Sequence, residues 1–210
     1  WTPDGRRVIY TSGVPIGNLF WRAADGTGNE ERLTTSPNTQ VAGSVSPDGT
    51  LAYQEHDPKS GVDIWLLPLH GSRQARRFVR TPLNEGNPKF SPDGRWLAYQ
   101  SNVSGRVETY IMAFPDGRRR IPITKGGGFF PIWSPDGREL YIRTAQPADG
   151  GGNMVAVTID TTGQDPKIGE PRVLFSGPFQ GNGDIAPDGR FLLLRATTRE
   201  ASTRVIQLVL

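Results

Sequence analysis

Residues 87–99, NPKFSPDGRWLAY, read as a strand, a tight turn and a second strand. The turn is Ser-Pro-Asp-Gly at residues 91–94. Proline sets φ at the second turn position, aspartate hydrogen-bonds its own backbone, and glycine adopts a positive φ without a Cβ clash. A type I turn followed by a left-handed glycine joins two antiparallel strands tightly. The stretch therefore predicts a β-hairpin.

The same turn recurs along the whole chain. Its proline stands at Pro3, Pro47, Pro92, Pro135 and Pro187, so that successive turns are 44, 45, 43 and 52 residues apart. Units of about 40 to 50 residues with a hairpin in each are typical of β-propellers, whose four-stranded blades surround a central channel. We predict an all-β fold, a β-propeller of four-stranded antiparallel blades. Its five repeat units cover about residues 1–36, 37–82, 83–125, 126–178 and 179–210.

The first and last units are incomplete. The first lacks most of its inner strand, and the last stops after its third strand. An open ring leaves an unpaired strand edge and an uncovered apolar face. We expect the chain to be a fragment of a propeller of about six blades, and a closed ring of five blades is the alternative.

Three apolar columns repeat from unit to unit, and each is expected to pack between neighbouring blades. The first stands just before the turn, at Val45, Phe90, Trp133 and Ile185. The second ends the strand after the turn, at Tyr10, Tyr53, Tyr99, Tyr141 and Leu193. The third lies in the next strand, at Phe20, Trp65, Tyr110 and Val155.

These features resemble a known family. The hairpin pattern and the closing hydrophobic-Thr, as in Leu33-Thr34 and Ile123-Thr124, are similar to the TolB-type, WD-like propeller repeat, also written PD40. More narrowly, residues 85–123, 132–141 and 170–175 resemble the C-terminal propeller of bacterial membrane-anchored serine/threonine kinases. The resemblance implies a bacterial interaction or sensor module in the periplasm or another extracytoplasmic compartment, with the cytoplasm as the alternative.

Composition sets further bounds. The formal charge of +3 is too small to indicate nucleic-acid binding. The chain has no cysteine, which excludes disulfides, thiol nucleophiles and thiolate metal sites. Its apolar runs are far shorter than the roughly 20 residues that cross a bilayer, so we expect no direct membrane insertion.

Groups for catalysis are scarce. His56 and His70 share no metal-ligand spacing, and there is no Gly-x-Ser-x-Gly elbow, phosphate loop or kinase motif. The turn aspartates lack the spaced oxygen ligands of a calcium loop. We predict no catalytic residue, no metal site and no cofactor within this chain.

A binding site is expected at a channel mouth, where loops from all blades converge on a rigid frame. The residues that enter the inner strands differ between units while the turns do not. Variable chemistry on a repeated frame is typical of a recognition surface. The candidate contacts are Glu85, Asn87, Phe129, Phe130, Gln180 and Asn182.

The sequence thus favours a non-catalytic module that binds a protein, a peptide or a cell-envelope component, as part of a receptor-type kinase or a Tol-type envelope protein. The alternative is the substrate-gating propeller of a prolyl-oligopeptidase-like serine hydrolase whose catalytic domain lies outside this chain.

Overall fold

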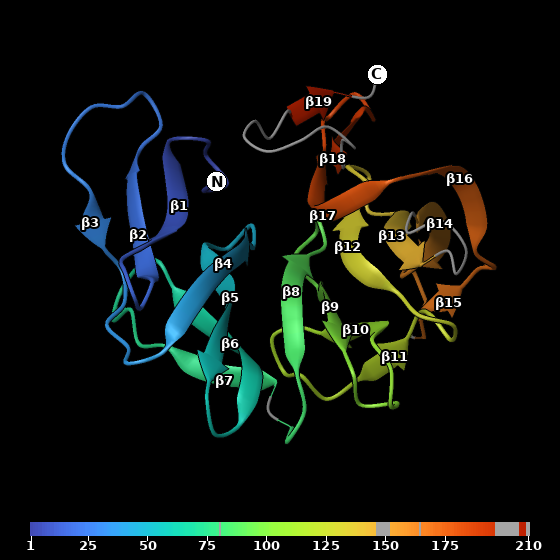
Figure 1. Cartoon of the computed structure of the whole chain (residues 1–210), viewed down its shortest axis with the longest axis horizontal. Coiled ribbons are helices and arrows are strands. Elements are labelled where there is room, and N and C mark those ends of the chain that lie inside the picture. Colours follow the sequence, from blue (N-terminus) through green and yellow to red (C-terminus); the bar gives the residue numbers. More distant parts are fainter. Residues whose placement is uncertain (80, 146–151, 164, 196–205, 209–210) are drawn as a thin grey trace, which may run out of the picture.

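In the computed structural model, the described residues are 1–210 except 80, 146–151, 164, 196–205 and 209–210. They form β-strands and turns, and none of them belongs to a helix. The strands make five antiparallel sheets that follow one another around a common centre (Figure 1). This confirms the predicted β-propeller of four-stranded antiparallel blades, with three-stranded sheets at its two ends.

The five sheets use the strands in chain order. The first contains β1 (Arg7–Ser12), β2 (Asn18–Ala23) and β3 (Glu31–Arg32). The second contains β4 (Thr39–Val45), β5 (Thr50–Asp57), β6 (Gly61–Pro68) and β7 (Arg76–Val79). The third contains β8 (Glu85–Phe90), β9 (Trp96–Ser101), β10 (Glu108–Ala113) and β11 (Arg120–Pro122).

The fourth sheet has a divided outer edge. It contains β12 (Phe129–Trp133), β13 (Glu139–Ala145), β14 (Gly152–Asp160), β15 (Lys167–Ile168) and β16 (Arg172–Gly177), and the last two both pair with β14. The fifth sheet contains β17 (Phe179–Ile185), β18 (Phe191–Arg195) and β19 (Ile206–Leu208). The strands β4, β8, β12 and β17 lie nearest the centre of the ring (Figure 1). We number the sheets as blades 1 to 5.

The repeated turn has the expected chemistry. In all five copies the glycine amide donates to the carbonyl three residues earlier at 2.9 Å, and the glycine φ lies between 68° and 88°. The aspartate Oδ1 accepts the backbone amide two residues on, as Asp136 does from Arg138 at 3.1 Å. The Ser134 hydroxyl and this amide, both donating to Asp136, lower the pKa of its carboxyl. The turn aspartates therefore serve the hairpin.

The core lies between blades. One cluster joins blades 1 and 2, a second joins blades 2 and 3, and a third joins blades 3 and 4. Because strand side chains alternate, β10 supplies Tyr110 and Met112 to the second cluster and Ile111 to the third. Blades 2 and 3 are thus each held by two different apolar faces.

Two departures from the expected core columns are seen. Tyr10 and Phe20 lie on the face of blade 1 opposite the cluster it shares with blade 2. One position of blade 4 is wrong by one residue. Tyr99 pairs with Tyr110 across blade 3, but Val155, the equivalent residue of blade 4, pairs with Ile142 and not with Tyr141. A shift of one residue moves a side chain to the other face of a strand. Tyr141 therefore points toward blade 5, where its ring lies 4.9 Å from the ring of Phe191.

A polar column was not anticipated. In three blades a buried polar residue stands two positions before the third apolar column, at Asn18 of β2, Asp63 of β6 and Glu108 of β10. In blade 3 the Thr124 hydroxyl accepts the Thr109 amide at 2.9 Å and donates to Glu108. In blade 1 the Thr34 hydroxyl accepts the Leu19 amide at 3.1 Å. The closing hydrophobic-Thr thus fastens the fourth segment of a blade to its third strand.

Candidate binding site

A cavity of about 420 Å³ lies where the inner strands end. The turn prolines of all five repeats line it: Pro3, Pro47, Pro92, Pro135 and Pro187. Because each blade adds the same turn to one end of the ring, the repeat itself builds this cavity. It is the mouth of the channel on the turn side.

The walls of this central cavity are mixed in character. Among its lining residues, Lys89 of β8 and Asp184 of β17 carry charge, and Ser44 adds a hydroxyl. The indole Nε1 of Trp133 donates to the Lys89 carbonyl at 3.1 Å, which ties β12 to β8. The cavity thus presents one cation and one anion on a rigid, mostly apolar frame, a typical arrangement for a binding site.

Three inner strands carry a β-bulge with a left-handed residue. The residues are Asn87 (φ 52°), Phe130 (φ 53°) and Gly181 (φ 61°). A glutamine from the previous blade supports two of them: Gln54 Oε1 accepts the Asn87 amide at 2.9 Å, and Gln100 Oε1 accepts the Phe130 amide at 3.3 Å. A bulky residue with positive φ is uncommon, and such strain collects at functional sites.

The bulges lead into the cavity. Asn87 precedes the lining residue Lys89 by two positions, and Asn182 precedes Asp184 in the same way. Phe130 stands two positions before Ile132, which also lines the cavity. Four of the predicted contacts, Asn87, Phe129, Phe130 and Asn182, therefore lie along the strands that line the channel.

Two other predicted contacts have different surroundings. Glu85 has no solvent-exposed surface, and its Oε1 accepts hydrogen bonds from the Thr81 and Ser101 hydroxyls at 2.6 and 3.2 Å. Burial raises the pKa of this carboxyl. Because Glu85 lies inside blade 3, we do not include it among the surface contacts. Gln180 pairs with Leu194 through its backbone, and its side chain is outside the described part of the chain.

The two phenylalanines lie side by side. Their ring centroids are 6.5 Å apart, and the Arg143 guanidinium lies 4.7 Å from the centroid of Phe130. Both rings are partly exposed. The pair can offer aromatic surface to a ligand, with a cation held against one of its rings.

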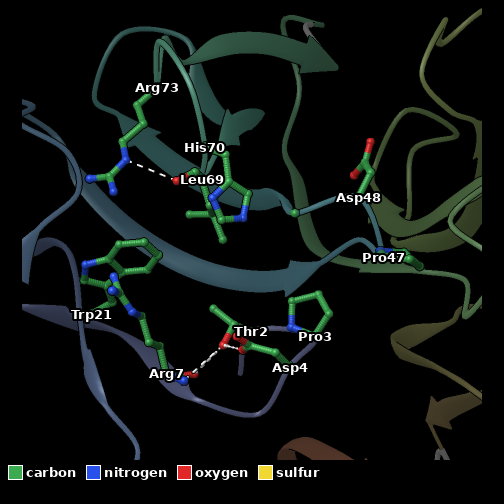
Figure 2. A pocket seen from close by; sticks show the side chains of 11 residues that line it. Thr2, Pro3, Asp4, Arg7, Trp21, Pro47, Asp48, Leu69, His70 and Arg73 are labelled. Carbon is green, nitrogen blue, oxygen red and sulfur yellow. Dashed lines mark hydrogen bonds between the residues drawn. The ribbon is translucent and has the colours of Figure 1, made fainter.

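A second cavity, of about 400 Å³, lies between blades 1 and 2 on the turn side. Figure 2 shows Arg7, Arg73 and Trp21 on one side of it, the aspartates Asp4 and Asp48 on the other, and His70 in between. Sequence reasoning missed this group, because its members come from separate repeats and meet only when two blades pack. The available signal was the arginines beside the turns: Arg7 follows the first turn, and Arg73 lies in the loop between β6 and β7.

Within the described ranges, no three histidine or acidic side chains are grouped so that they could hold a metal ion. No helix in those ranges has the length and apolar character needed to cross a membrane.

Comparison with known proteins gives the family. The PD40 family, described as the TolB beta propeller domain, matches residues 1–210. This chain belongs to the TolB beta propeller family. The resemblance read from the repeated hairpin is thereby confirmed.

Relatives of this TolB-family chain include proteins of different kinds. The uncharacterized protein Atu1656 of Agrobacterium fabrum is 27% identical over 141 residues, which are 66% of this chain and 47% of that protein. The uncharacterized peptidase YuxL of Bacillus subtilis is 31% identical over 111 residues, which are 46% of this chain and 16% of that protein. The chain thus spans less than half the length of these relatives.

Solved structures share the fold. TolB from Acinetobacter baumannii has a TM-score of 0.78 at 18% identity, over 94% of this chain and 48% of that one. A putative TolB from Agrobacterium tumefaciens has a TM-score of 0.73 at 20% identity, over 90% and 69%. A puromycin hydrolase has a TM-score of 0.66 at 17% identity, over 90% and 34%. The same fold therefore occurs in TolB proteins and as one part of a hydrolase chain.

Proposed function

We propose that this propeller is a non-catalytic interaction module that binds a protein, a peptide or a cell-envelope component at the centre of the ring. The observation that carries the proposal is the central cavity, because every repeat contributes its turn to it and it contains Lys89 and Asp184. The left-handed residues Asn87 and Phe130 lead into it. Membership of the TolB family supports a macromolecular partner.

The proposed contacts form a path along the channel. Lys89 and Asp184 provide charge at the turn side, and Asn87, Phe129, Phe130 and Asn182 follow along the inner strands. An extended peptide suits such a path, since its successive side chains point to alternate sides and can meet different walls of the channel.

The test has two steps. A photo-reactive residue in place of Ser44, in the full-length protein in its native cells, would identify the partner by mass spectrometry. Lys89→Gln and Phe130→Ala are then expected to weaken binding of that partner at least tenfold each, as loss of an interface anchor does. Lys59→Gln, an exposed lysine in the β5–β6 turn, is the matched control. Unchanged affinity in both channel variants would remove the proposed site.

The proposed function also implies a compartment and a larger assembly. We place the module outside the cytoplasm, in the periplasm, as the sensor part of a membrane-anchored kinase or as part of a Tol-type envelope assembly. The absence of cysteine permits this compartment as well as a reducing one. Fractionation of native cells, with detection of the full-length protein, tests the location, and recovery in the cytoplasmic fraction would contradict it.

A second function is supported by a specific similarity. The uncharacterized peptidase YuxL and the puromycin hydrolase are both similar to this chain. In a hydrolase, this propeller would gate substrate access to a catalytic domain elsewhere in the protein. Phe130→Ala would then change the size of peptides cleaved by the full-length protein, while binding no separate partner. A full-length sequence without a Gly-x-Ser-x-Gly motif would exclude this alternative.

A further inference from the structure

The cavity between blades 1 and 2 separates its charges. Arg7 and Arg73 stand on one wall, and Asp4 and Asp48 stand on the other (Figure 2). It borders the central cavity only at Pro3 and Pro47. The two walls therefore offer opposite charges to one ligand, at a place distinct from Lys89 and Asp184.

The cationic wall is held in place by a buried indole. The guanidinium carbons of Arg7 and Arg73 lie 3.9 and 4.8 Å from the centroid of the Trp21 ring. Glu31 accepts the Trp21 Nε1–H at 2.7 Å and an N–H of Arg73 at 2.5 Å. A guanidinium has five N–H donors, and the hydrogen bonds of Arg73 to Glu31 and to the Leu69 carbonyl use only part of them. The remaining donors are positioned before a ligand arrives.

The acidic wall keeps free acceptor atoms. Asp4 Oδ1 accepts the Thr2 hydroxyl and the Arg6 amide, and Asp48 Oδ1 accepts the Ser46 hydroxyl and the Thr50 amide. Within the described part of the chain, the Oδ2 atom of each aspartate has no hydrogen-bond donor. Both side chains are exposed. Each can accept a hydrogen bond from a cationic group.

His70 lies between the two walls. A Cβ on Gly49 would come within 2.9 Å of its ring, so only glycine lets the imidazole rest on this turn. The ring makes no hydrogen bond to any described residue, and its residue is exposed. It is therefore free to contact a ligand and to report on one.

We propose that this cavity binds a zwitterionic ligand. Arg7 and Arg73 would take the carboxylate, Asp4 and Asp48 would take the protonated amine, and His70 would lie beside the chain that joins them. The volume of about 400 Å³ falls within the range of small-ligand sites. Either a free amino-acid-like molecule or a peptide segment with one basic and one acidic side chain carries this chemistry.

The equivalent cavity between blades 3 and 4 shows why this one is special. There Arg95 is bonded to its own turn aspartate, Asp93, at 2.7 Å, and it also reaches the Thr161 hydroxyl at 3.2 Å. Asp160 occupies the place that His70 has in the first cavity. Arg95 is thus paired with an aspartate that lines its own cavity. In the first cavity Arg7 and Arg73 pair instead with Glu31, which does not line it, so among the described residues the aspartates of that cavity stay unpaired with arginine. The cavity between blades 3 and 4 therefore serves as an internal control.

The two histidines make the test direct. The imidazole resonances of His70 and His56 are followed by NMR during titration with ω-amino acids from β-alanine to ε-aminocaproate, to about 10 mM, a range that detects millimolar affinity. We expect the His70 signals to shift and the His56 signals to stay. The alkylamine and the carboxylate of matched length are expected to shift His70 much less. Equal shifts from the single-charge compounds would overturn the proposal.

A second arm separates the two sources of the ligand. It uses a blocked peptide with one lysine and one glutamate, titrated in the same way. A response to the free ω-amino acids assigns the site to a small molecule, and a response to the peptide alone assigns it to a partner chain. No shift of His70 in either arm would overturn the proposal, whatever the channel variants show.

Matched variants complete the test. Arg73→Gln and Asp48→Asn are each expected to weaken binding about tenfold, roughly the effect of one lost charged contact. Asp136→Asn makes the same change in the turn of blade 4 and should leave binding unchanged. Asp48→Asn keeps an oxygen for the turn, so folding is retained. Equal affinity in Asp48→Asn and Asp136→Asn would contradict the assigned acidic wall.

Discussion

The fold shifts the pKa values of two glutamates in opposite directions. Glu85 is buried among neutral hydroxyls, with Oε2 unpartnered, and burial raises the pKa of its carboxyl. The nearby charge of Asp63 raises this pKa further. Glu31 is half exposed, and hydrogen bonds from Arg73 and Trp21 lower the pKa of its carboxyl. The two residues therefore respond oppositely to pH.

The sign of each effect follows from linkage. Because the pKa of Glu85 is higher in the folded state, its contribution to stability is complete below the unfolded value of about 4.3 and is lost as pH rises through the folded value. Urea unfolding of wild type and Glu85→Gln over a pH series should show the wild type losing stability relative to the variant as pH rises. Glu31→Gln should show the reverse trend, with the wild type losing its advantage as pH falls. If the stability of Glu85→Gln and of wild type changed in parallel with pH, the pKa of Glu85 would not be raised in the folded state.

Asn87 tests the strain in the bulge. Its φ of 52° is tolerated by asparagine and glycine but costs about 1–2 kcal/mol for other L-residues. Asn87→Gly should therefore change the free energy of unfolding by only a few tenths of a kcal/mol, whereas Asn87→Val should lower it by about 2 kcal/mol. Chemical denaturation measures both. Equal stability of the two variants would show that the bulge relaxes.

At the scale of elements, the repeated turn also packs against the turn of the previous blade. Gly5 and Gly94 have φ of 68° and 70°, so alanine is strained equally at both positions. A Cβ at Gly94 would come within 2.9 Å of the Pro47 ring of the previous blade, whereas a Cβ at Gly5 meets nothing within 4 Å. The two glycines form a matched pair.

Gly5→Ala should cost about 1 kcal/mol through backbone strain alone. Gly94→Ala should cost about 1–3 kcal/mol more, because overpacking is added to the strain. The difference between the two thermal or urea midpoints isolates the contact between blades. If both variants lose the same stability, Pro47 moves aside freely and the turn has no packing role.

The hairpin was predictable because its chemistry is local. Proline, aspartate and glycine act within four residues, so the turn and its period could be read directly and the fold followed. The exchange of Tyr141 for Ile142 was a misalignment of the repeats, because Tyr99 and Ile142 each stand seven residues after their turn proline. The burial of Glu85 was missed for a different reason: it begins an inner strand, and the polar column inside the blade was not recognised.

The candidate contacts were predicted only in part. Asn87, Phe129, Phe130 and Asn182 were found because variable residues stood out against constant turns. Their left-handed bulges were not foreseen, since neither Asn87 nor Phe130 is glycine. The charged residues of the two cavities come from different repeats, and only the ring brings them together. The sequence pattern of a single repeat cannot predict that residues of different repeats lie close together.

For the whole molecule, the arrangement of the core sets how mutations combine. Ile111 and Val157 are fully buried in the cluster between blades 3 and 4, and Leu19 is fully buried in the cluster between blades 1 and 2. Each cluster draws on two adjacent blades, and blade 2 alternates between two clusters. Distant clusters share no side chain.

Alanine at each of these three positions should lower the free energy of unfolding by about 2–5 kcal/mol through lost burial and a residual cavity. A double-mutant cycle of Ile111→Ala with Val157→Ala should show a coupling of about 0.5–3 kcal/mol, because the two truncations open one shared space. The cycle of Ile111→Ala with Leu19→Ala should be additive within about 0.5 kcal/mol, since the cluster between blades 2 and 3 separates the two sites. Urea unfolding of the single and double variants measures both cycles. Strong coupling between Ile111 and Leu19 would mean that the blades pack as one continuous core, and the ring could then not be treated as a series of separate interfaces.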